Sequence, residues 1–133
     1  MQLKNKIKVF YERPLAATVE NHPLSVIADC MVATPMEFNT PRNPFFFLQE
    51  FKKGKGEKRD PEAQMLSAML IAQHNNQDGK PLYGGYLVGG NWRFTTLIQK
   101  DYCVSRQFDA TQKTDLLQIV SALRQLKQLI LNR

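Results

Sequence analysis

The strongest constraint on the fold is a change of hydrophobic period near residue 60. Residues 45–53, "FFFLQEFKK", form a short apolar run typical of a buried strand. Asp60 then suits the N-cap of a helix, and Pro61 suits its first turn. Apolar residues follow at helical spacing, at positions 65, 66, 69, 70 and 72. We therefore predict a strand, a loop and a helix that ends before residue 77, with Gly79 available as its C-cap.

Two more segments before this change have the composition of strands. Residues 3–10 alternate lysines with apolar residues, which predicts a half-exposed strand. Residues 24–34 are apolar and rich in β-branched side chains, which predicts a second strand. We expect residues 12–23 to be a connection, and the proline-rich residues 35–44 to be a loop.

The segments after the helix predict a hairpin, a short strand and a closing helix. Residues 82–90 and 91–99 have strand composition and meet at a Gly-Gly-Asn sequence, which is typical of a hairpin turn. Residues 101–110 predict a short strand and a turn. From Thr114 onward, an amphipathic helix is predicted by apolar residues at three- and four-residue steps: Leu116, Val120, Leu123, Leu126 and Ile130.

The predicted order, β-β-β-α-β-β-(β)-α, favours an α/β (α+β) fold with a central mixed sheet flanked by helices. The helix between the third and fourth strands is long enough to be a crossover. A chain of 133 residues suits one domain, 1–133, rather than two. With 43% hydrophobic and 23% charged residues, its composition is that of an ordinary globular protein.

Net charge and cysteine content indicate the class of binding partner and the cellular compartment. The formal net charge of +6 favours a polyanionic partner such as nucleic acid, although a generically basic protein is an equal alternative. No apolar run is long enough to span a bilayer, and no signal peptide is evident, so we expect a cytoplasmic protein and no membrane partner. Cys30 and Cys103 are expected to be buried thiols rather than a disulfide.

Basic residues gather directly after the third predicted strand. Four of them, Lys53, Lys55, Lys58 and Arg59, lie within seven residues that also contain two glycines. Such a cluster can contact a phosphate backbone without reading sequence. A solvated loop is an equally good interpretation.

Three charged residues interrupt the apolar strands. Asp29 lies in residues 24–34, and Glu50 and Lys52 lie two residues apart in residues 45–53. Burying a charge is costly unless a partner compensates it. If the loop at 35–44 closes an antiparallel hairpin, paired positions sum to 79, so Asp29 lies opposite Glu50. Glu50 and Lys52 then share one face, because the strand period is two.

Two carboxylates this close repel each other, and a divalent cation would remove the conflict. Mg²⁺ is typically held by one or two carboxylates together with waters, and such an ion can activate a water molecule. The three side chains therefore fit metal-assisted phosphodiester hydrolysis. A cross-strand ion pair between Asp29 and Lys52, or a neutral acid, would also explain the buried charges.

The acid in one strand, the Glu50-Phe51-Lys52 tripeptide in the next and the capped helix that follows resemble the PD-(D/E)xK nuclease superfamily. The resemblance covers roughly residues 7–131 and implies a restriction-endonuclease-like fold. It implies that Asp29 and Glu50 bind Mg²⁺ or Mn²⁺, with the carbonyl of Phe51 as a third ligand. It further implies that Lys52 orients the attacking water and that Gln64 supports the site.

The sequence departs from the superfamily pattern in places. Ala28 replaces the proline before the first acid, Ala68 stands where some members have tyrosine, and no helix precedes the first strand. Two hypotheses follow: a Mg²⁺-dependent nuclease acting on DNA, or an inactive nuclease-like fold that binds nucleic acid or protein. The consecutive apolar residues 129–131 suggest that the closing helix contacts a second copy in a homodimer.

Overall fold

This computed structural model describes residues 7–35, 41–52 and 60–132. It has a sheet-dominated α+β architecture with two helices, as the sequence predicted at this coarse level. The elements in chain order are β1 (Lys8–Val19), β2 (His22–Pro35), β3 (Pro41–Lys52), α1 (Pro61–Asn76), β4 (Leu82–Val88), β5 (Asn91–Ile98), β6 (Asp101–Val104), β7 (Phe108–Asp109) and α2 (Lys113–Leu131).

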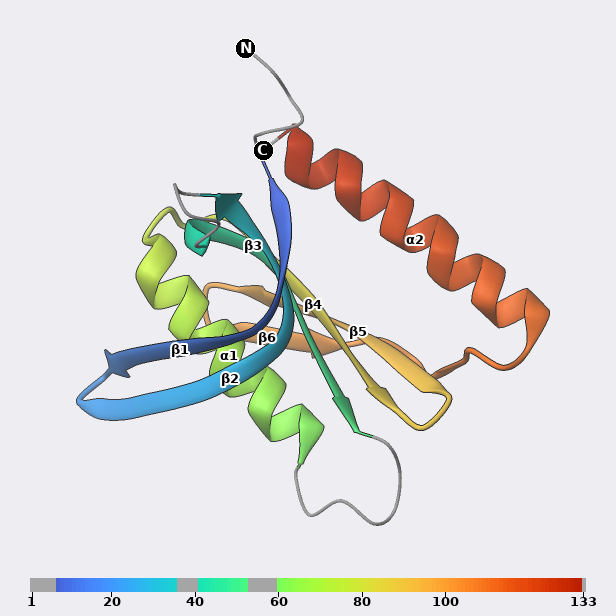
Figure 1. Cartoon of the computed structure of the whole chain (residues 1–133), viewed down its shortest axis with the longest axis horizontal. Helices are drawn as coiled ribbons and strands as arrows, with labels where there is room; N and C mark the ends of the chain where they lie inside the picture. The colour runs from blue at the N-terminus through green and yellow to red at the C-terminus, as the bar shows by residue number, and fades with distance from the viewer. Residues whose placement is uncertain (1–6, 36–40, 53–59, 133) are drawn as a thin grey trace.

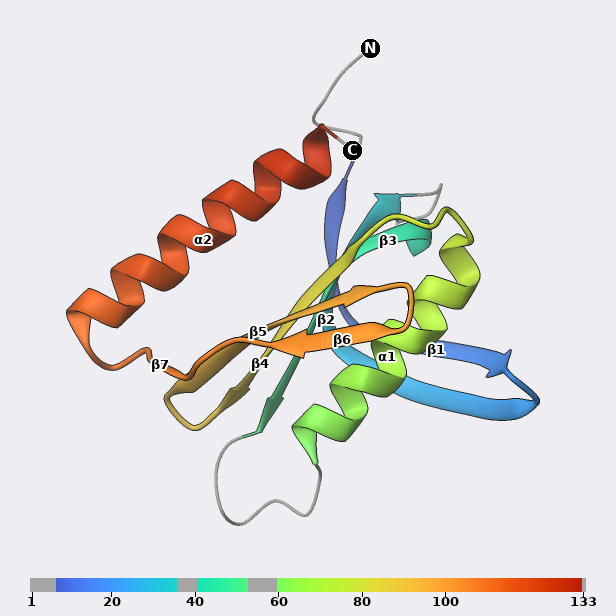
Figure 2. The same cartoon turned by 180° about the vertical axis from the view of Figure 1, so that it is seen from behind.

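The strands form one mixed sheet in the order β1-β2-β3-β4-β5-β6, with β7 paired to β5 beside β6. β3 and β4 are parallel and α1 connects them, which confirms the predicted crossover. The other pairs are antiparallel. The two helices lie on different sides of the strands (Figures 1 and 2).

Each face of the sheet packs against one helix. The core on the α1 face is the larger of the two, and Met65, Met69 and Ile71 of the helix are fully buried in it. On the α2 face, Ile119 and Ile130 pack with Phe47 and Trp92. Residues 45–47 are all buried, as predicted for a core strand, but they divide between the faces: Phe45 joins the α1 core, and the next two phenylalanines join the α2 core.

The prediction of a connection at residues 12–23 was wrong, because β1 continues to Val19 and pairs with β2 on both sides of an interruption at Glu12. The turn is only Glu20 and Asn21, both with positive φ (48° and 67°), as in the tight turns favoured by hairpins. Pro14 is tolerated because β1 is an edge strand and needs no donor on its outer side. The β1–β2 hairpin curves away from the other strands as a long arm (Figure 1).

The loop prediction for residues 35–44 was also wrong in part. β3 begins at Pro41, and the ladder pairs Thr34 with Arg42 rather than with Phe45. Two register shifts follow on either side of Ala33, after which Val32 pairs with Phe47. The predicted register, in which positions sum to 79, therefore holds for residues 30–32 against 47–49 and fails nearer the loop. These irregularities absorb the extra residues of β3.

A bend crosses β1 and β2 at Glu12 and Asp29. Glu12 has a φ of 51°, which is unusual for a residue with a side chain. The buried positions change parity here in both strands: Phe10 is followed by Leu15, and Ala28 is followed by Met31. The bend turns the hairpin arm away from β3 at Asp29, next to the last ladder pair of β2 and β3.

Helix α1 begins and ends where the sequence predicted. The carboxylate of Asp60 accepts hydrogen bonds from the backbone N–H groups of Glu62 and Ala63, which confirms the N-cap. At the other end, the C-cap is Gln77 in the left-handed conformation (φ 47°), and not Gly79. The side chain of Asn76 then forms two hydrogen bonds of 2.7 Å with the backbone N–H and carbonyl of Phe45, joining the end of α1 to β3.

The C-terminal half follows the prediction closely, with one change in α2. β4 and β5 meet at Gly89 and Gly90 as expected. In α2, however, Leu116 and Leu123 of the predicted apolar stripe are 44% and 38% exposed, while Ile119 is buried. The helix contacts the sheet along a narrower stripe than its apolar face. This leaves part of that face uncovered among the described residues.

Candidate active site

Asp29 lies where the β2–β3 ladder ends. The last ladder pair is Cys30 with Gln49, so the predicted pair of Asp29 opposite Glu50 is not part of the ladder. Beyond it, the carboxylate of Asp29 accepts a 2.8 Å hydrogen bond from the backbone N–H of Phe51. Because this N–H belongs to the peptide that links Glu50 to Phe51, the structure brings Asp29 against the Glu-x-Lys tripeptide.

Glu50 and Lys52 share the α1 face of the sheet. Their neighbours in β4 are Tyr86 and Val88, which both pack with the α1 core. Side chains of directly paired residues project from the same face of a sheet. Glu50 is only 1% exposed, whereas Lys52 is half-buried at the end of β3. The predicted geometry of a carboxylate and an ammonium on one face is therefore present.

Two further residues, Tyr86 and Arg93, lie in one row with Glu50 across neighbouring strands, and neither was predicted to belong to the site. Tyr86 pairs with Glu50 on one side and with Arg93 of β5 on the other. Burial raises the pKa of Tyr86, the carboxylate of Glu62 raises it further, and the guanidinium of Arg93 opposes both. These couplings place Glu62 and Arg93 near the same row. Sequence spacing within one strand could not show this, because the row crosses three strands.

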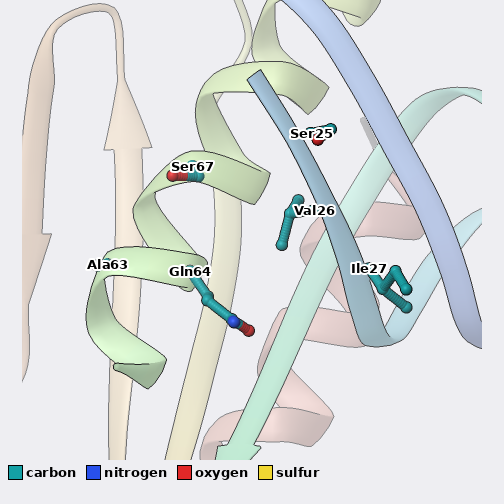
Figure 3. Close-up of a pocket in the computed structure, with 6 residues that line it drawn as sticks. All are labelled: Ser25, Val26, Ile27, Ala63, Gln64 and Ser67. Atoms are coloured by element: carbon teal, nitrogen blue, oxygen red, sulfur yellow. The ribbon is translucent and has the colours of Figure 1, made fainter. Parts of the chain in front are cut away.

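Gln64 lines a hollow beside the same part of the sheet. The hollow has a volume of about 410 Å³ and lies between the first turns of α1 and residues 25–27 of β2. The side chain of Gln64 points from the helix toward the strands (Figure 3). The hollow therefore opens next to the stretch of β2 that leads into Asp29, which places the amide of Gln64 on the same side of the fold as Glu50.

The donor set suits a hard divalent cation. Asp29 and Glu50 supply carboxylate oxygens, which Mg²⁺ and Mn²⁺ prefer over nitrogen and sulfur ligands. A carboxylate has two oxygens, so the hydrogen bond to Oδ2 of Asp29 is compatible with a cation at Oδ1. Within residues 7–35, 41–52 and 60–132, no group of three or more His, Cys, Asp or Glu side chains could hold a metal ion. A cation here would therefore depend on two carboxylates, the backbone and water.

The two cysteines are free thiols in different surroundings. Cys30 is half-buried, and burial, followed by the neighbouring charge of Asp29, raises the pKa of its thiol. Cys103 is exposed on β6, so the prediction that both thiols are buried was wrong for this one. Residue 103 lies on an edge strand, where one side of the ladder is open.

Some predictions fall outside the described residues. Lys53, Lys55, Lys58 and Arg59 all lie in the stretch between β3 and α1 that the structure leaves undescribed. In the part of the chain that is described, no helix is both long and apolar enough to cross a membrane. Comparisons with protein-family models, with curated proteins and with solved structures found no match.

Proposed function

We propose that this chain is a nuclease that depends on Mg²⁺ or Mn²⁺, hydrolyses phosphodiester bonds of DNA and has a restriction-endonuclease-like fold. The observation that supports this best is the hydrogen bond between Asp29 and the backbone N–H of Phe51. It joins the acid of β2 to the Glu-x-Lys tripeptide of β3. The mixed sheet and the α1 crossover are compatible with that fold.

Each side chain has a distinct role in this proposal. Asp29 and Glu50 bind the cation, with the carbonyl of Phe51 as the third protein ligand. The cation, when bound, lowers the pKa of a water molecule and neutralises charge on the phosphate. The ammonium of Lys52 orients the attacking water and stabilises the negative charge that develops on the phosphate oxygens. Gln64 supports the site from α1.

The direct test is cleavage of plasmid and linear DNA with Mg²⁺ or Mn²⁺. We expect Glu50→Gln and Lys52→Met each to lower the cleavage rate by about 100-fold or more, as loss of a catalytic group typically does. Glu20→Gln and Lys100→Met are matched controls, because both residues are exposed and neither has a role in the proposal. Purified protein that leaves every nucleic acid intact with either metal would contradict the proposal.

A second candidate is a nuclease-like fold without activity that binds nucleic acid or protein. One observation favours it: Asp29 already has a structural role, because it stabilises the end of β3 through Phe51. Titration calorimetry with Mn²⁺ separates the two candidates. Binding in the micromolar to millimolar range that Asp29→Asn abolishes supports the nuclease, whereas no binding by the native protein supports the inactive fold.

We also propose that two copies of this chain form a homodimer through α2. Leu129 is 54% exposed near the end of the helix, while Ile130 packs into the α2 core. A homodimer would present two sites to the two strands of a duplex. Analytical ultracentrifugation tests this, and a monomer at every concentration would remove it.

A further inference from the structure

Two exposed aromatic side chains lie on the α2 side of the sheet, beyond the area that the helix covers. Tyr11 of β1 is 68% exposed and Phe51 of β3 is 38% exposed. A group of exposed apolar side chains on one surface often marks a binding site, whereas a single exposed side chain does not.

The strand register places both rings on the same face. Val32 and Phe47 pair with each other and pack against α2. Val9, which pairs with Val32, lies beside them on this face. Because side chains alternate along a strand, residues two positions away share the face. Tyr11 is two residues from Val9, and Phe51 is four from Phe47.

The two rings flank Asp29. Tyr11 pairs with Cys30, which directly follows Asp29, and Cys30 pairs with Gln49. Phe51 is two residues beyond Gln49, and its own N–H donates to the Asp29 carboxylate. Neighbouring strands are about 4.8 Å apart, so Tyr11 and Gln49 are separated by about 10 Å across β2.

A cavity lies next to the two rings on this face, although neither ring is among the residues that line it. Cys30 and Gln49 line a cavity of about 520 Å³ that separates this part of the sheet from α2. On the helix side, its lining includes Leu123 and the cationic residue Lys127. This face therefore combines aromatic rings, an apolar hollow and positive charge, in a chain whose net charge is +6.

We propose that Tyr11 and Phe51 form a platform that stacks unpaired bases of single-stranded DNA on the α2 side of the sheet. Glu50 and Lys52 project from the opposite, α1 side, so this binding surface goes beyond the proposed nuclease function and does not depend on it. Every base has a π face, so aromatic platforms bind single strands with little sequence preference, while basic residues attract the backbone. A paired duplex keeps its bases stacked inside and cannot use the rings in this way.

Fluorescence anisotropy tests the platform without any cleavage. A labelled oligothymidylate and a hairpin duplex of equal charge are titrated in EDTA, so that metal-dependent hydrolysis cannot occur. We expect the single strand to bind more tightly. We also expect Tyr11→Ala and Phe51→Ala each to weaken its binding about 5- to 150-fold, the usual range for one stacked base. Duplex binding should change by less than twofold.

Two further variants separate stacking from general surface effects. Tyr11→Phe keeps the ring and should retain the affinity, whereas Tyr11→Leu keeps only apolar area and should lose it. Leu117→Ala removes an apolar side chain of α2 whose exposure, 58%, lies between those of the two rings, and it should have no effect. Equal affinity of the native protein for both DNAs, or unchanged single-strand binding in both alanine variants, would overturn the proposal.

Cysteine labelling locates the bound strand independently. Cys30 lies between the two rings, while Cys103 is on β6 at the opposite edge of the sheet. Saturating oligothymidylate should slow the reaction of Cys30 with N-ethylmaleimide and leave that of Cys103 unchanged, as measured by mass spectrometry. Equal protection of both thiols, or of neither, would show that the strand is not bound at this surface.

The outcomes keep the two proposals distinct. If Glu50→Gln abolishes cleavage but the alanine variants bind DNA normally, the nuclease proposal stands and the platform is wrong. If the rings bind single strands but no metal supports cleavage, the platform proposal is supported and the nuclease proposal is wrong.

Discussion

The carboxylate of Asp29 accepts a 2.8 Å hydrogen bond from the backbone N–H of Phe51, one position beyond the last ladder pair of β2 and β3. A side chain thus replaces a backbone partner at the point where the hairpin arm bends away. This contact fixes the end of β3, where Glu50 and Lys52 project from one face. It makes Asp29 both a structural residue and the proposed metal ligand, and these two roles can be separated experimentally.

Replacing Asp29 by Asn and by Ala should separate its structural role from its proposed role in metal binding. Asp29→Asn keeps an oxygen that can accept from Phe51, so the free energy of unfolding should fall by less than about 1 kcal/mol. Asp29→Ala removes the acceptor and should cost about 1–2 kcal/mol. Both variants should lose Mn²⁺ binding, because neither has the charge. Urea unfolding and titration calorimetry measure the two effects, and Mn²⁺ binding retained by Asp29→Asn would exclude this residue as a ligand.

Asn76→Ala should destabilise the fold by about 2 kcal/mol. Asn76 at the end of α1 makes two hydrogen bonds of 2.7 Å to the backbone of Phe45, and each part-buried bond is worth about 1 kcal/mol. Chemical unfolding followed by circular dichroism measures the loss. His74→Ala, an exposed change in the same turn, should cost less than about 0.5 kcal/mol. Equal losses in the two variants would mean that the bonds contribute nothing specific.

Gly85→Ala should be destabilising by about 1–3 kcal/mol, the usual cost of overpacking. A Cβ atom at Gly85 would lie 2.1 Å from a ring atom of Trp92. The buried ring packs edge-on against Phe94, with centroids 5.4 Å apart, so it can move only by disturbing the α2 core. Thermal unfolding measures the cost. The same change in a Trp92→Leu background should cost clearly less, and an undiminished cost there would contradict the explanation.

Tyr102→Phe should leave stability at pH 7 unchanged or raise it by up to about 1 kcal/mol. The hydroxyl of Tyr102 is buried and has no hydrogen-bond partner among the described residues. Burial, Glu62 and Tyr86 raise the pKa of Tyr102 above its ordinary value near 10. A raised pKa means that the native protein resists ionisation, so its stability is full below pH 10 and declines as the pH rises further.

Urea unfolding at pH 8 and pH 11 tests this. The native protein should lose more stability between the two pH values than Tyr102→Phe does. A residual loss is expected in the variant, because burial and Glu62 also raise the pKa of Tyr86. Identical losses in the two proteins would show that Tyr102 does not titrate abnormally.

Local sequence rules succeeded at the start of α1 and at the β4–β5 turn, where the decisive interactions lie close together in the chain. Asp60 caps α1 through N–H groups two and three residues away. The β4–β5 hairpin turns at Gly89, where φ is 60°. The same rules failed at residues 12–23, because an edge strand tolerates Pro14, and nothing in the local sequence shows which strand will lie at an edge.

For the candidate site, the sequence by itself determined that Glu50 and Lys52 share a face, because alternation is a property of a single strand. Tertiary structure decided the rest. The register shifts beside Ala33, the bend at Glu12 and the approach of Asp29 to Phe51 all depend on how separate strands pack. The row from Glu50 through Tyr86 to Arg93 crosses three strands, and its members are joined only when the sheet assembles. A sequence fixes periods along one strand, whereas positions across strands follow from burying all the apolar faces at once.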